Sequence, residues 1–147
     1  MGFLYSKPDD WKTSRAALYA KEGVSNGLPE IEAGEYFIEW LAHDLGWCDQ
    51  DGMGNLRAHS WLEIDAMDRQ LGLRLEPDEA RMIRTMSNAY IDGHHHGKEA
   101  MAVAPAYDDR DDDPGIALER RIVSEKIKAG MGGAKASRSR GVYSPQF

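Results

Sequence analysis

The sequence is poor in cysteine, in long apolar runs and, outside its C-terminal part, in basic residues. Because Cys48 is the only cysteine, no disulfide can form within one chain. The longest uncharged apolar run, residues 100–106, is far too short to span a bilayer, so we expect no transmembrane helix. Residues 1–10, MGFLYSKPDD, show none of the features of a secretory leader. These absences predict a protein of a reducing cytoplasm.

Charge is divided unevenly along the chain. Residues 1–115 hold 11 basic and 23 acidic side chains, a net charge near −12, whereas residues 116–147 hold 7 basic and 2 acidic, near +5. An acidic body repels a phosphate backbone, so we do not expect the domain to bind nucleic acid. The basic C-terminal part alone is suited to an anionic surface.

Apolar periodicity predicts an all-α fold of four to five short helices in a single domain, residues 1–129. The predicted helices cover residues 35–47, 60–72, 77–93 and 113–130, with a weaker one ending at Gly23 and capped by Asp9 or Asp10. The clearest start is the capping box of Ser60 and Glu63. Pro77 and Asp113 mark two further starts, and the predicted stops are Gly46, Gly72, Gly93 and Gly130.

The second and third of these helices are predicted to pack as a hairpin, because only the short segment LRLEP separates them. Their inner faces should form the core of the protein. The side chains expected to face inward are Trp61, Ile64, Met67, Leu71, Met82, Ile83, Met86, Ala89 and Tyr90.

Two segments read as flexible. Residues 93–113 form an acidic linker, and residues 130–147 form a tail rich in glycine, serine and basic residues. We expect the tail to be a recognition element, because apolar anchors there alternate with cations that would be attracted to an acidic surface. The candidate partner-binding residues are Lys135, Arg138, Arg140, Val142, Tyr143 and Phe147.

Three consecutive histidines, His94 to His96, are the strongest candidate for chemistry. In an extended segment His94 and His96 point the same way and could share a metal, with Asp92, Asp108 or Cys48 as further donors. No second pair of histidines or cysteines at ligand spacing completes such a site. We therefore predict a solvated loop without a metal or other cofactor, and keep a small metal-binding protein or metal-dependent hydrolase as the alternative.

Other candidate motifs are incomplete. Asp109, Asp111 and Asp113 have the first spacings of a calcium loop, but Pro114 and Arg120 replace its glycine and its bidentate glutamate. The segment GMGGAKAS does not satisfy the phosphate-loop pattern. Cys48 could be paired with His43 or His59 as nucleophile and base, although a cysteine beside Trp47 is more typical of packing. Gly2 and Ser6 match the loose myristoylation pattern, which bulky Phe3 and the lack of a nearby basic cluster disfavour.

The block HSWLEIDAMDRQLGLRLEPDEARMIRTMSNAYIDG, followed by PAY at residues 105–107, resembles small proteins encoded among the tail genes of tailed bacteriophages, including tail assembly chaperones. The resemblance implies a helical, non-enzymatic protein of the host cytoplasm that holds tape measure protein or tail tube subunits during assembly. The acidic linker and the basic tail match no motif of that group. They leave open a role as a structural component of the virion, with self-association as a further expectation.

Overall fold

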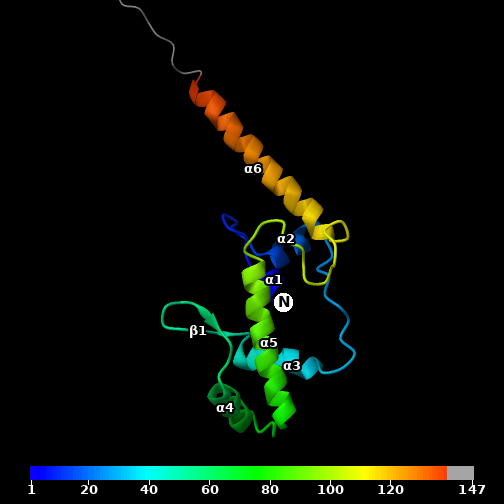
Figure 1. The fold of residues 1–147 in the computed structure, drawn as a ribbon, viewed down its shortest axis with the longest axis vertical. Coiled ribbons are helices and arrows are strands. Elements are labelled where there is room, and N and C mark those ends of the chain that lie inside the picture. The colour runs from blue at the N-terminus through cyan, green and yellow to red at the C-terminus, as the bar shows by residue number, and fades with distance from the viewer. Residues whose placement is uncertain (139–147) are drawn as a thin grey trace, which may run out of the picture.

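The computed structural model describes residues 1–138, with side chains as far as Met131. The chain is mostly helical, and one two-stranded hairpin is added to the helices. In chain order the elements are α1 (Gly2–Tyr5), α2 (Arg15–Glu22), α3 (Glu35–Glu39), the π-helical turn η1 (Trp40–Leu45), β1 (Asp49–Gln50), β2 (Leu56–Arg57), α4 (Trp61–Leu71), α5 (Pro77–His96) and α6 (Pro114–Arg138). Helix α5 runs through the body, with α3 and α4 near one end and α1 and α2 near the other (Figure 1).

Local sequence signals set most helix ends. The capping box of Ser60 and Glu63 is present at the start of α4, and Gly72 ends that helix in the left-handed region. Pro77 begins α5 as predicted. The weaker N-terminal helix is present too, but it starts later than expected. Ser14, and not Asp9 or Asp10, caps α2, because the Ser14 hydroxyl accepts the amide of Ala17 at 3.4 Å.

The predicted helix pair forms one of two cores. Its buried side chains are Leu41, Ile64, Met67 and Ile83. Three large side chains expected to face inward are instead exposed: Trp61 is 50% exposed, Leu71 47% and Met82 47%. Trp61 lies in the first turn of α4, where the Arg84 guanidinium covers its ring at 4.9 Å from the centroid. Ala89 is likewise exposed, so the apolar faces of the pair are narrower than predicted.

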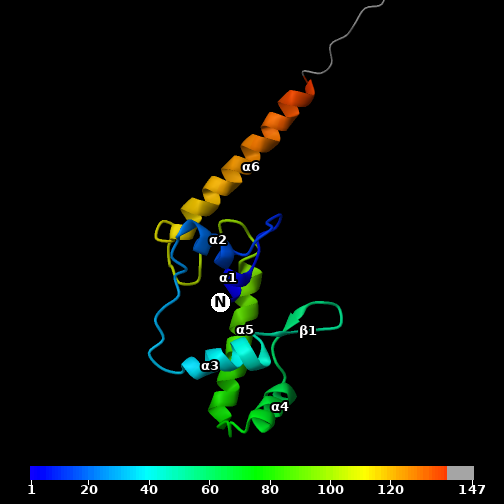
Figure 2. The same ribbon diagram turned by 180° about the vertical axis from the view of Figure 1, so that it is seen from behind.

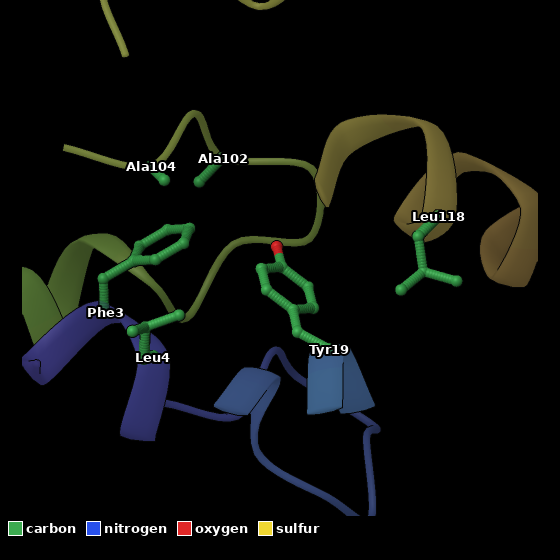
Figure 3. Packing of buried hydrophobic residues seen from close by; sticks show 6 residues of the cluster. All are labelled: Phe3, Leu4, Tyr19, Ala102, Ala104 and Leu118. Atoms are coloured by element: carbon green, nitrogen blue, oxygen red, sulfur yellow. The ribbon is translucent and has the colours of Figure 1, made fainter. Parts of the chain in front are cut away.

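The second core joins segments that are far apart in the sequence (Figure 3). Its buried side chains are Phe3, Leu4, Tyr19, Ala102, Ala104 and Leu118. Two of them, Ala102 and Ala104, belong to the segment predicted to be a flexible acidic linker. That prediction is wrong for this stretch, because its small apolar side chains are buried in one cluster with Phe3, Leu4 and Leu118. Its acids face outward, apart from buried Asp113.

Glycines let α1 lie directly on α5. A Cβ at Gly2 would stand 1.8 Å from the carbonyl oxygen of Tyr90, and a Cβ at Gly93 would stand 3.0 Å from the amide nitrogen of Phe3. Gly97 is equally crowded, by the Ser6 hydroxyl at 1.9 Å. Gly93 was predicted to stop the helix, but α5 continues to His96. The glycine instead permits close packing of α1.

A small hairpin, which the sequence did not predict, projects from the body (Figure 1). Its strands are antiparallel, with Asp49 opposite Arg57. The Asp51 carboxylate closes the turn by accepting the amides of Met53 at 2.8 Å and Asn55 at 2.9 Å. The side-chain amide of Asn55 also donates to Asp51, at 2.8 Å, and this bond, followed by the two backbone amides, lowers the pKa of Asp51.

Helix α6 leaves the body as a single rod in both views (Figures 1 and 2). It was expected to end at Gly130, but its backbone is helical as far as Arg138. A glycine within a helix costs about 1 kcal/mol but does not by itself end it. Residues 130–138, predicted as flexible tail, are thus part of a helix. Among the described residues, no helix is both long and apolar enough to cross a membrane.

Candidate functional site

The base of α6 is held by a fully buried ion pair. Arg15 Nε donates to Glu119 Oε1 at 2.6 Å, and both side chains have no exposed surface. The Tyr19 hydroxyl also donates to Glu119, at 3.0 Å. Burial and the neighbouring Glu119 carboxylate raise the pKa of Tyr19, so its hydroxyl keeps its proton and remains a donor. Because these groups saturate one another, Glu119 is placed as a structural anchor and not as an acid or base.

Arg15 connects the base of α6 to the C-terminal end of α5. Its guanidinium donates to the carbonyl oxygens of Gly97 and Glu99 and to the Ser6 hydroxyl. These acceptors are buried or half-buried, so without Arg15 each would lose a hydrogen-bond donor in a place that water does not readily reach. The direction in which α6 leaves the body is therefore fixed by interactions with three other segments.

Asp113 completes this anchor as the residue before α6. One carboxylate oxygen accepts the amide of Gly115 at 2.8 Å, and the other accepts the amide of Ala104 at 2.8 Å. Asp113 was predicted as a cap, and its carboxylate is occupied by these two amides. Asp113 is 4% exposed. The third aspartate of the incomplete calcium-loop motif is therefore a buried structural residue and not a solvated one.

The outer part of α6, from Arg120 to Met131, contacts the body through individual side chains. Arg121 pairs with Glu22 at 2.9 Å, and Lys126 reaches the carbonyl oxygen of Asp10 at 3.2 Å and covers the Trp11 ring at 5.6 Å. Beyond this point Ile127 is 58% exposed and Met131 68% exposed. The helix is thus anchored at one end and presents apolar side chains to solvent at the other.

These side chains lie on one face, which we call the α6 stripe: Val123, Ile127 and Met131. They are spaced four apart, so a helix of 3.6 residues per turn places them above one another. The exposed charges of this part of α6 are mostly basic, because it carries Glu125 as its one exposed acid. The exposed bases are Arg120, Arg121, Lys126 and Lys128. An apolar line flanked by cations is suited to a partner surface that is both apolar and acidic.

The residues predicted as partner-binding divide into two groups. Lys135 and Arg138 lie on the α6 backbone, so they extend the same rod. Arg140, Val142, Tyr143 and Phe147 lie outside the described residues. The sequence had assigned recognition to the tail alone, whereas the described part of the rod already carries exposed apolar and basic side chains.

No protein-family model, curated protein or solved structure matches this chain. The chemistry of its own side chains is therefore what supports a function.

The three histidines occupy the last turn of α5 and are not in an extended loop. On a helix, residues two apart point to nearly opposite sides, so His94 and His96 do not share a ligand position. His96 Nε2 lies 2.8 Å from the carbonyl oxygen of Val103. His94 is half-buried, and burial, followed by Lys98 and His95, lowers its pKa. Within residues 1–138, no three His, Cys, Asp or Glu side chains are grouped to hold a metal ion.

Cys48 does not have the surroundings of an activated thiol. Burial and the neighbouring Asp49 raise its pKa, whereas a nucleophilic cysteine needs a lowered one. The two histidines considered as its base are engaged elsewhere. His59 Nε2 contacts the carbonyl oxygen of Gly46 at 2.9 Å, and exposed His43 pairs with Glu39 at 3.4 Å.

A cavity of about 310 Å³ lies beside α1 and α5, where Leu28, Pro29 and Ala89 contribute to its walls. The lining side chains are apolar or amide, and the titratable group among the lining residues is the terminal amino group of Met1, whose pKa is lowered by burial. Such a cavity is suited to an apolar group.

Proposed function

We propose that this protein acts by binding other proteins and not by catalysis, and that the outer part of α6 is its recognition element. The observation that carries the proposal is the anchored, projecting helix with Ile127 and Met131 exposed. Burying such side chains contributes about 25 cal/mol per Å² of apolar area, which a lone helix in water does not obtain. A helix presented in this way is suited to a groove or helix face of a partner.

The biological setting proposed is morphogenesis of a tailed bacteriophage, with tail or virion proteins as partners. The support is the pattern of the central block, where Trp61, Glu63 and Ile64 are followed by Leu71, Gly72 and Leu73 and then by Pro77, Glu79, Ala80, Ile83, Met86, Ala89 and Tyr90. Within this setting the protein serves as a tail assembly chaperone, holding tape measure protein or tail tube subunits, or stays in the particle as a structural component.

The test is co-expression with the virion proteins encoded in the same genome, followed by co-purification. Ile127→Asp and Met131→Asp place a charge in the α6 stripe and should lower the amount of captured partner at least about tenfold. Ala129→Asp is the matched control, because Ala129 is exposed on the opposite side of the same helix. Circular dichroism verifies that each variant is folded. Equal capture by the stripe variants and the control would refute the proposal.

A further inference from the structure

One surface of the body has the properties that complement the α6 stripe. It consists of residues 28–39, from the segment before α3 through the end of that helix, and we call it the acidic surface. Its exposed apolar side chains are Leu28 at 43%, Ile31 at 41% and Tyr36 at 45%. Along the same segment the carboxylates of Glu30, Glu32, Glu35 and Glu39 are exposed.

The charge of this surface is not compensated along the chain. Between Lys21 and Arg57 the sequence holds no lysine or arginine. The opposite holds for the outer part of α6, where basic residues outnumber the single exposed acid, Glu125. Apolar groups flanked by acids on one side and by bases on the other give both the buried area and the electrostatic attraction that association needs.

The two surfaces cannot meet within one molecule. In both views the segment before α3 runs along the body from α2 down to α3, while α6 leaves from the end of the body far from α3 and points away from both (Figures 1 and 2). The Arg15–Glu119 ion pair fixes the base of α6 in that direction. A contact between the α6 stripe and the acidic surface must therefore involve two copies.

We infer that the α6 stripe of one copy docks on the acidic surface of a second copy, so that copies associate head to tail. This rests on the proposed function, because it names the chain itself as one partner of the recognition helix. The contact joins two different surfaces, so each bound copy still offers one free α6 stripe and one free acidic surface. Such a contact continues into a ring or an open filament.

The first experiment measures the mass of the full chain by sedimentation and light scattering as its concentration rises, at about 50 mM and about 500 mM salt. The expected result is growth beyond a dimer at low salt and a loss of association at high salt, because screening weakens attraction between exposed charges. A chain that remains monomeric at every concentration in low salt overturns the inference.

The second experiment separates this contact from pairing between two α6 helices. Glu30→Lys/Glu32→Lys disables the acidic surface, and Ile127→Asp disables the stripe, so each variant alone should be monomeric. Mixed, the two should form a one-to-one dimer that grows no further, since one intact surface remains on each. If α6 paired with α6, the Glu30→Lys/Glu32→Lys variant would form dimers by itself, and the mixture would contain no one-to-one dimer of the two variants, which overturns the inference.

Charge reversal gives a matched control. Arg120→Glu/Lys128→Glu should weaken self-association at least about tenfold, and combining it with Glu30→Lys/Glu32→Lys in one chain should restore it. A combined variant as weak as either pair would overturn the inference.

Failure of this inference is distinct from failure of the proposed function. A monomeric chain that still captures virion proteins through Ile127 and Met131 keeps that function, whereas a self-associating chain with α6-independent capture loses it.

Discussion

Arg15 is a fully buried charged side chain that joins four segments of the fold. Replacing it by methionine leaves the Glu119 carboxylate buried without a cation and removes the donor to the Gly97 and Glu99 carbonyls. Breaking a buried pair in this way costs about 3–5 kcal/mol. We expect Arg15→Met to lower the free energy of unfolding by that amount in urea titrations.

Two comparisons give this prediction its control. Arg69→Met removes an exposed pair with Asp65 and should change stability by less than about 1 kcal/mol. Replacing both Arg15 and Glu119 by methionine removes both charges and should recover part of the loss. If Arg15→Met were as stable as Arg69→Met, the ion pair would not be the anchor described above.

His94 should make stability depend on pH. Its pKa is lowered in the folded protein by burial and by Lys98 and His95, so the folded state binds a proton less readily than the unfolded chain. Stability is therefore lost as pH falls below about 6.5, the usual imidazole value, toward the lowered value. His94→Gln should have a flatter stability profile over this range. His95→Gln, at an exposed neighbouring position, removes the smallest of these causes but leaves His94 buried, so it should keep most of the slope of the original protein.

At the scale of elements, the close packing at the end of α5 gives a prediction that compares two glycines. Gly97 lies in that packed region, and Gly130 lies on exposed α6. A Cβ at Gly97 would lie 1.9 Å from the Ser6 hydroxyl and 3.0 Å from Arg15 Nη1, whereas a Cβ at Gly130 would meet no atom within 4 Å. Gly97→Ala should lower the free energy of unfolding by about 1–3 kcal/mol through overpacking. Gly130→Ala should instead raise the helical circular dichroism signal, because alanine favours helix by about 1 kcal/mol. Equal effects of the two changes would contradict this packing.

Capped helices could be predicted from the sequence, whereas the shortest elements could not. The capping box at Ser60 and the proline at residue 77 act within one turn, so the signal is local and readable. Helix α1 has four residues and each strand has two, which is too few to show a period. The prediction at Gly93 was wrong because glycine occurs both where a helix ends and where a neighbouring backbone packs closely. The sequence alone does not distinguish these two uses.

At the scale of the whole molecule, the sequence predicts the chemical character of the candidate site but not which of its side chains are exposed. The amphipathic and cationic character of α6 is visible in its sequence. That Ile127 and Met131 remain uncovered depends on where the body ends, which is set by the packing of Phe3, Tyr19 and Leu118 across the chain. Sequence spacing carries no information about such distant contacts, and for the same reason the Arg15–Glu119 pair was not foreseen.

The separation of that pair has a consequence for how the chain folds during synthesis. Glu119 follows Arg15 by 104 residues, and at about 5–20 residues per second a ribosome needs roughly 5–20 s to add them. Helices α4 and α5 are close in sequence and can pair during this interval, since local contacts form early. Helix α1 can pack on α5 in the same interval, whereas Tyr19 and Arg15 lack their partners Leu118 and Glu119 until α6 is made. Helix α6, the last of the described helices to be synthesised, therefore completes the second core and at the same time carries the proposed recognition surface.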